Sequence, residues 1–222
     1  MKYAWLKAMR WRRARGRCEE PLRGVLGSDL PPASSAFEDV EFVAVDIETT
    51  GLDPATADML SAGWVIVRDG NVVLDTARSR IVRPSGEVGD SASVHGLTDT
   101  FVGQGDDWGV VLDSIVSVLG GRVLLVHHAG LDKALLDRMC LQRYGAKLLV
   151  PVVDTLALEM RRQQSKHHLE AGASLKLSDL RGAYSLPRYA AHDCLVDAIA
   201  TAELLVAMAA HRGSPELGEL LT

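Results

Sequence analysis

Residues Glu41 to Gly51 read EFVAVDIETTG, and the interpretation of the whole chain starts from this stretch. Its apolar, partly β-branched run predicts a buried strand that the closing Thr-Thr-Gly terminates. Side chains alternate along a strand, so Asp46 and Glu48 should project from one face. Two adjacent carboxylates beside a core repel each other and are costly to desolvate. Either a divalent cation with oxygen ligands neutralises them, or the strand simply runs out into solvated acids.

The composition is typical of a globular protein with one main domain. The chain has 222 residues, of which 47% are hydrophobic. We find no apolar run that approaches the roughly 20 residues needed to span a bilayer, and the N-terminus lacks the continuous apolar core of a secretory signal. The three cysteines, Cys18, Cys140 and Cys194, are widely spaced and form no metal-type pair. We therefore expect a reducing, cytoplasmic location and no membrane association.

The net charge of -5 is unevenly distributed. Residues 1–23 contain eight Lys and Arg against Glu19 and Glu20, a balance of +6, whereas the remainder has 16 bases and 27 acids, a balance of -11. An acidic body is compatible with nucleic-acid binding if the acids hold metal ions, because a bound metal reverses the local charge.

The order of the expected elements indicates an α/β fold. Strands are predicted over residues 42–47, 59–67, 72–82, 123–126 and 148–153, and the Asp69-Gly70 pair predicts a tight hairpin between the second and third. Helices are predicted over residues 108–119, 131–144 and 156–162, from 175, and over 193–210. The first strands should be antiparallel and the later ones parallel, in a mixed sheet with helices on both faces. In such sheets, sites form beyond the carboxyl ends of the strands.

Three segments are expected along the chain. Residues 1–39 should form a basic N-terminal arm, in which residues 1–23 could form an amphipathic helix, followed by a linker rich in Gly, Pro and Ser at 24–39. Residues 40–212 should form the main domain, and residues 213–222 a C-terminal tail.

Three further motifs follow VDIETTG in the chain, namely VHGLTD, HHAGLD and YAAHDCLVDAIATAELL. In this order and spacing the set resembles the proofreading-type 3′-5′ exonucleases, the DnaQ-like DEDD family with a catalytic histidine, over about residues 41–210. The resemblance implies a ribonuclease-H-like fold and a two-metal hydrolase that uses Mg²⁺ or Mn²⁺. It also implies metal-binding roles for four acids and a general-base role for one histidine: Asp46, Glu48, Asp132, Asp197 and His192. The same resemblance implies substrate contacts at Thr49, Thr50, Gly51, Leu52, His95 and His128.

These residue types suit the implied chemistry. Hydrolysis of a phosphodiester needs an activated water, neutralisation of the developing charge and stabilisation of the leaving oxygen. Carboxylates are the preferred protein ligands of Mg²⁺ and Mn²⁺. Histidine suits the base because its unperturbed pKa lies close to working pH.

Each residue also has a structural interpretation. Asp132 could be a favourable charge at a helix N-terminus, Asp197 a solvated acid, His192 a surface histidine and His95 a loop histidine. Asp193 is a good N-cap for the final helix. Asp154, at a strand end, either supports the site or caps the helix that follows.

Two positions depart from the family pattern. His128 stands where the family usually has Asn, and Leu131 where it usually has Phe, so substrate contacts or local packing should differ. Neither is an expected metal ligand. His167 and His168 lie in a polar stretch without a third ligand at suitable spacing, which argues against a zinc site.

The leading hypothesis is a metal-dependent exonuclease acting on single-stranded or frayed 3′ ends, with DNA favoured over RNA. Two alternatives remain: an exoribonuclease of the same fold, and a non-catalytic module that binds nucleic acid or a polymerase. The basic arm, with Trp5 and Trp11, suits either nucleic acid or a protein partner that docks on it.

Overall fold

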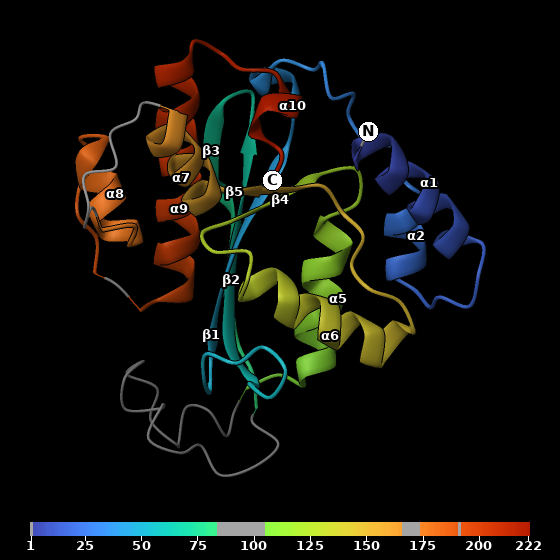
Figure 1. Cartoon of the computed structure of the whole chain (residues 1–222). Coiled ribbons are helices and arrows are strands. Elements are labelled where there is room, and N and C mark those ends of the chain that lie inside the picture. Colours follow the sequence, from blue (N-terminus) through green and yellow to red (C-terminus); the bar gives the residue numbers. More distant parts are fainter. Residues whose placement is uncertain (1, 84–104, 166–173, 191) are drawn as a thin grey trace.

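A five-stranded mixed sheet forms the centre of the molecule. The computed structural model describes residues 2–83, 105–165, 174–190 and 192–222. The sheet order is β3-β2-β1-β4-β5 (Figure 1). β1 pairs antiparallel with β2 and parallel with β4, β2 pairs antiparallel with β3, and β4 pairs parallel with β5. The strands are β1 (Phe42–Thr49), β2 (Met59–Arg68), β3 (Asn71–Ile81), β4 (Val123–Val126) and β5 (Val152–Asp154). The predicted mixed α/β fold is therefore confirmed.

Helices cover both faces of the sheet (Figure 1). One layer contains α7 (Thr155–Ser165), α8 (Leu177–Ala183), α9 (Cys194–Arg212) and α10 (Leu217–Leu220). The opposite layer contains α1 (Lys2–Ala14), α2 (Leu22–Gly27), α5 (Trp108–Val118) and α6 (Asp132–Tyr144). A short 3₁₀ turn, η1 (Phe37–Asp39), precedes β1.

β1 is buried on both faces, and its alternation sets the orientation of the acids. Val43, Val45 and Ile47 pack into the core under α5 and α6, whereas Phe42 and Ala44 pack into the core under α9. By the same alternation, Asp46 and Glu48 project toward the α9 side. The register between β1 and β2 shifts between Glu48 and Thr49, so a bulge ends the strand directly after the second acid.

The hairpin predicted at Asp69 and Gly70 joins β2 to β3. Both residues have positive φ, 52° and 68°. This left-handed pair matches the twist of the flanking strands, which is why Asp-Gly favours such turns.

Residues 1–23 contain the helix considered for them, α1, whereas residues 24–39 differ from the linker that we expected. Instead of a linker, residues 24–39 include the end of α2 and η1, and Val25, Leu26 and Phe37 are buried in the two cores. Arg10 of α1 is only 2% exposed. Composition misled the prediction, because Gly, Pro and Ser mark irregular backbone whether or not it packs.

Arg10 fixes α1 to the body of the protein. Its guanidinium donates to the backbone carbonyl oxygens of Leu149 at 2.8 Å, Val25 at 2.7 Å and Ser28 at 3.0 Å. Burial lowers the pKa of Arg10 to about 10, so it stays protonated at neutral pH. Three carbonyls from two segments, residues 25–28 and Leu149, thus depend on one side chain.

We expect Arg10→Met to lower the free energy of unfolding by about 2–4 kcal/mol, because it removes three buried hydrogen bonds but keeps most of the volume. Arg12→Met, an exposed position on the same helix, should change it by less than about 0.5 kcal/mol. Urea unfolding measures both. Equal losses in the two variants would contradict the anchoring role.

The C-terminal residues also pack rather than form a free tail. Leu217 and Leu220 of α10 are fully buried, and the Leu217 and Gly218 amides donate to the carbonyls of Ser35 and Ala33 at 2.9 and 2.7 Å. The boundaries proposed at residues 39 and 212 stay a prediction, but both flanking segments contribute to the cores.

Smaller differences concern element ends. The strand expected over 148–153 is shorter, since only Val152–Asp154 pairs with β4, although Leu148 and Val150 are buried. α7 extends to Ser165, into the stretch expected to be a loop. His95 and the His167-His168 pair lie outside the described residues.

In the described part of the chain, α9 is the one helix long and apolar enough to cross a membrane by length and composition. It packs against β1, β2 and β3, and half of its apolar window is buried. These contacts are those of a core helix.

Candidate active site

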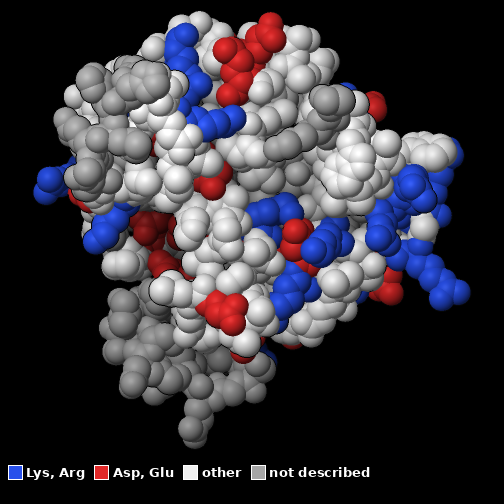
Figure 2. Space-filling view, viewed as in Figure 1, with Lys and Arg blue, Asp and Glu red and all other residues white. Residues whose placement is uncertain are grey.

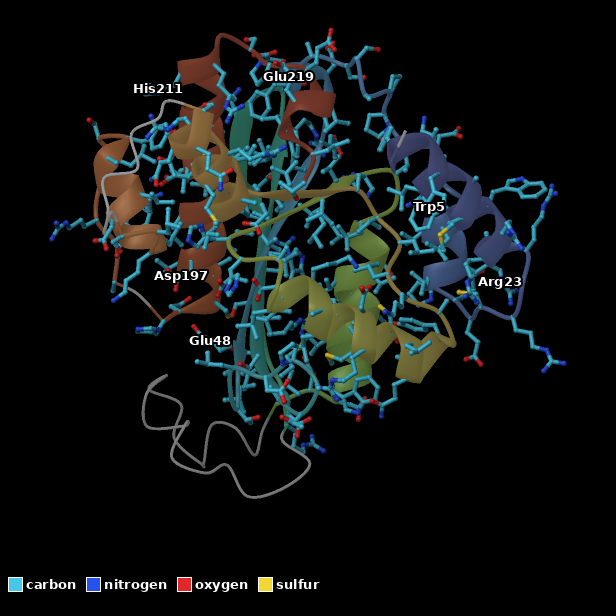
Figure 3. The ribbon with its side chains drawn as sticks, viewed as in Figure 1. Trp5, Arg23, Glu48, Asp197, His211 and Glu219 are labelled. Atoms are coloured by element: carbon cyan, nitrogen blue, oxygen red, sulfur yellow. The ribbon has the colours of Figure 1, made fainter. Side chains whose placement is uncertain are left out.

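Three acids from two distant segments converge at the end of β1. Asp46 and Glu48 come from β1, and Asp197 comes from the first turn of α9. One carboxylate oxygen from each lies within 4.8 Å of the others. Figure 3 shows Glu48 and Asp197 approaching the same region from the sheet and from α9. The carboxylate of Asp197 thus faces two others, and its role as a metal ligand stays a prediction.

The start of α9 explains how Asp197 reaches β1. Asp193 is the N-cap, as expected, and its carboxylate accepts from the amides of Leu195 at 2.9 Å and Val196 at 3.1 Å. Gly63 of β2 pairs with Asp46 in the sheet. A Cβ at Gly63 would lie 2.4 Å from the backbone of Cys194, so only glycine lets α9 approach this closely. Sequence reasoning did not single out Gly63, because a glycine inside an apolar strand carries no such signal by itself.

Asp132 is the fourth acid. It begins α6 and is 5% exposed, and it lies outside the 4.8 Å group. Among the neighbouring charges that raise the pKa of Asp46, that of Asp132 is nonetheless the largest. Burial first, and then the charge of Asp154, raise the pKa of Asp132 to about 8. The buried Asp132 carboxyl therefore begins a helix and also interacts electrostatically with Asp46 and Asp154.

Burial is also the main cause that raises the pKa of Asp46 and of Asp197. The charges of Asp132, Asp197 and Glu48 raise that of Asp46 further. Without cations, the cluster is relieved only by taking up protons. Ionisation of all these carboxyl groups is unfavourable because the charges repel one another. Hard divalent cations such as Mg²⁺ or Mn²⁺ bind carboxylate oxygens and offset this repulsion.

This arrangement predicts that the free energy of unfolding of the metal-free protein depends on pH. The pKa of Asp132 is about 8 in the folded protein and about 3.9 when unfolded. The protonated form therefore contributes stability that is complete below about pH 4 and is lost as the pH rises through about 8. In EDTA, Asp132→Asn should become more stable than the parent by about 2–5 kcal/mol between pH 4 and pH 8.

Urea unfolding at several pH values measures this difference, with Asp75→Asn, an exposed acid on β3, as the control. Parallel stability curves for Asp132→Asn and the parent would contradict the assignment. Added Mg²⁺ should restore the parent at pH 8, because the cation replaces the protons.

Asp154 has both of the roles considered for it. Its carboxylate accepts from the amide of Leu156 at 2.9 Å, which caps α7. It also accepts from the amides of His128 at 3.0 Å and Ala129 at 2.8 Å. This second pair fixes the loop between β4 and α6 that leads to Asp132. Asp154 thereby positions the fourth acid while raising its pKa.

The two histidines of the HHAGLD motif differ in environment. The His127 ring lies between the Thr155 hydroxyl, 2.8 Å from Nδ1, and the Leu175 carbonyl, 3.0 Å from Nε2. Burial lowers the pKa of His127, so the neutral ring is favoured there. This ring joins β4 to α7 and to the segment before α8. His128 is exposed and has a φ of 98°.

His192 lies at the exposed edge of the acid cluster. Its amide donates to Asp197 Oδ2 at 2.9 Å, with a φ of 71°. The chain before it is held by Arg181, which is 2% exposed and donates to the carbonyls of Pro187 at 2.9 Å and Ala200 at 2.8 Å. Glu203 accepts from both Arg181 and the Tyr189 hydroxyl. Sequence reasoning missed this network, whose signal was only an arginine in a short apolar helix.

The end of β1 and the turn after it contain four of the expected substrate residues, Thr49 to Leu52. Thr49 Oγ1 donates to the Gly51 carbonyl at 2.7 Å, and Thr50 Oγ1 accepts from the Asp58 amide at 2.9 Å. Arg138 of α6 holds the far side of the turn through the carbonyls of Pro54 and Ala57. The turn leaves Leu52 87% exposed. Substrate contacts at Thr49, Thr50, Gly51, Leu52 and His128 stay predictions.

Comparison with known proteins decides the family. The sequence model of the exonuclease (RNase_T) family matches residues 43–205, nearly three quarters of the chain. The chain belongs to this exonuclease family. The resemblance inferred from the motifs is thereby confirmed.

The relatives that this family member matches are larger proteins. It is 30% identical over 202 residues to a DNA polymerase III subunit epsilon-like protein of Rhodobacter capsulatus, covering 88% of this chain and 28% of that one. It is 30% identical over 149 residues to the PolC-type DNA polymerase III of Thermotoga petrophila, covering 63% of this chain and 11% of the other. The chain thus spans well under half of these relatives. The first alignment is longer than residues 40–222, so it extends into the N-terminal segment.

Solved exonucleases share the fold of this family member. Escherichia coli exonuclease I in complex with a dA16 oligonucleotide gives a TM-score of 0.65 at 17% identity, covering 77% of this chain and 41% of that one. Exonuclease X in complex with 5′ overhanging duplex DNA gives 0.60 at 21% identity, covering 81% and 97%. These similarities establish the ribonuclease-H-like architecture.

The close approach at Gly63 gives a test of the site geometry in this exonuclease. We expect Gly63→Ala to push α9 away from β2 and to lower kcat/KM about 100-fold, because a displacement of about 1 Å can cost that much. Gly182→Ala, with open space around the added methyl, should leave kcat/KM within about twofold. Steady-state hydrolysis and urea unfolding measured together separate misplacement from unfolding. An active Gly63→Ala enzyme would contradict the positioning role.

Proposed function

We propose that the protein is a metal-dependent 3′-5′ exonuclease that hydrolyses phosphodiester bonds at nucleic-acid 3′ ends by a two-metal mechanism, acting on DNA in preference to RNA. The observation that carries this proposal is the convergence of Asp46, Glu48 and Asp197 within 4.8 Å on a fold of the exonuclease family. Structural neighbours bound to DNA oligonucleotides, and relatives that are DNA polymerases, support DNA as the polymer.

Each residue of the cluster has a role in this proposal. The carboxylates of Asp46, Glu48, Asp132 and Asp197 would hold two Mg²⁺ or Mn²⁺ ions. Such ions would supply neutralisation of the charge that develops on the phosphate and stabilisation of the leaving 3′ oxygen. His192, beside Asp197 at the solvent edge, takes the proton from the attacking water as general base. Asp154 and Asp193 hold the segments that carry Asp132 and Asp197.

The turn after β1 is the proposed substrate contact. Its local hydrogen bonds hold the backbone around Gly51, and the exposed Leu52 offers an apolar surface to the terminal base. His95 and His128 complete the proposed set. The protein is proposed to act in the cytoplasm, which is supported by three buried cysteines that are all free thiols.

Incubation with strands labelled at the 5′ end tests polarity, polymer and metal together. Single-stranded DNA and RNA of equal sequence are incubated with Mg²⁺, Mn²⁺ or EDTA. A ladder that shortens one nucleotide at a time on DNA, with metal only, is the expected result. Immediate release of labelled mononucleotide would reverse the polarity, preference for RNA would indicate an exoribonuclease, and bound but intact strands would indicate a non-catalytic module.

A further inference from the structure

The outer surface of α1 and the residues that follow it is a fixed cationic surface. Six exposed bases lie there: Lys7, Arg12, Arg13, Arg15, Arg17 and Arg23. The only acids in residues 1–23 are Glu19 and Glu20. Figure 2 shows Lys and Arg gathered on this side of the molecule. Because Arg10 ties α1 to three backbone carbonyls of the body, these charges have a defined arrangement. We call this set of six the α1 surface.

These charges are not neutralised within the protein. Among the residues that the structure describes, none of the six forms an ion pair within 4.0 Å, whereas arginines elsewhere on the surface do, such as Arg68 and Arg122 with Glu41 and Arg143 with Asp113. The helix dipole accounts for a positive charge in the last turn of α1, at Arg12 and Arg13. It does not account for the bases beyond the helix end.

Two large aromatic side chains are exposed beside these bases. Trp5 is 63% and Trp11 58% exposed. The Arg15 guanidinium lies over the Trp11 ring, 3.8 Å from its centroid. Aromatic rings placed among Lys and Arg side chains are the combination that binds single-stranded nucleic acid, because the bases stack on the rings while the cations contact the phosphates.

We propose that the α1 surface, with Trp5 and Trp11, is a second nucleic-acid site that binds the phosphate backbone and bases of a single strand away from its 3′ end. The negative charge of a nucleic-acid strand complements the positive charge of this surface. The net negative charge of the metal-free body repels the same strand. This inference rests on the nucleic-acid substrate proposed above. The residues of the acid cluster and of the α1 surface lie at opposite sides of the molecule in Figure 3, where Glu48 and Asp197 are far from Trp5 and Arg23.

The distance between the acid cluster and the α1 surface predicts that affinity depends on the length of the strand. A domain of this size is about 44 Å across, from a radius of gyration of about 17 Å. A strand of 30 nucleotides spans about 100 Å even at the rise of one duplex strand, and five nucleotides span about 17 Å. A strand of dT30 can therefore occupy both sites, whereas dT5 cannot.

Fluorescence anisotropy with labelled dT30 and dT5 tests the proposal. Measurements are made in the Asp46→Asn background, so that strands stay intact whether or not the parent hydrolyses them. The Asp46→Asn protein without further changes should bind dT30 at least tenfold more tightly than dT5. The variant Arg12→Glu/Arg15→Glu/Arg17→Glu should lose this difference, and its slope of log affinity against log salt should fall by about 2 for three lost phosphate contacts.

The matched control is Arg78→Glu/Lys176→Glu/Arg212→Glu, which reverses three exposed bases elsewhere with the same change of net charge. It should keep the preference for dT30. Trp11→Ala should weaken dT30 binding about fivefold or more with little change of slope, since it removes stacking but no charge. Replacing the same three arginines by glutamine gives the same test with less effect on folding.

Two results would overturn the proposal. Equal weakening by both triple variants would mean that only net charge matters. Unchanged dT30 affinity and slope in the α1 variant would mean that the strand does not bind this surface. Neither result bears on hydrolysis at the acid cluster, which the end-labelled assay decides separately.

Discussion

Asp46→Asn should reduce exonuclease turnover by several orders of magnitude while leaving the protein folded. Asparagine keeps the shape of the side chain but removes the charge at the centre of the cluster, where burial and then the charges of four other acids raise the pKa of Asp46. Electrostatic stabilisation by bound cations carries most of such a reaction, so the loss of one ligand charge is not compensated elsewhere. Asp197→Asn should behave alike, because its carboxylate oxygen belongs to the same 4.8 Å group.

Single-turnover hydrolysis at saturating Mg²⁺ measures this loss. Asp75→Asn is the matched control, since Asp75 is an exposed acid on β3, and it should keep full activity. In EDTA at pH 8, Asp46→Asn should be at least as stable as the parent, because relief of the clustered anions offsets any lost contact. Normal turnover by either cluster variant would show that the site has been misassigned.

His192→Ala should lower kcat about 10²–10⁴-fold, the range expected when a general base is removed. The matched comparison is His128→Ala, because His128 is the exposed histidine of the HHAGLD motif with which the base could be confused. Both positions have positive φ, 71° and 98°, so alanine carries a similar backbone cost at each. His128→Ala should change mainly KM, by less than about tenfold.

The relative size of the two losses decides which histidine is the base. A larger kcat loss in His128→Ala than in His192→Ala would show that the base has been misplaced.

Features that depend on a few neighbouring residues were predictable from the sequence. The alternation of β1 put Asp46 and Glu48 on one face, Asp69-Gly70 predicted the hairpin, and Asp193 was recognised as the N-cap of α9. These features follow from side-chain periodicity, turn geometry and capping, which act within one strand, turn or helix end. The family motifs supplied the rest of the candidate site.

Features that depend on segments distant in the chain came only from the tertiary structure. Asp197 meets Asp46 because Gly63 of a third segment admits the start of α9, and no local pattern encodes that approach. The N-terminal segment looked like an arm and a linker, yet Arg10 and Leu26 pack into the body. Composition and periodicity report which residues can be buried, whereas packing decides which surfaces meet, because burial free energy depends on the partner surface and not on the sequence around it.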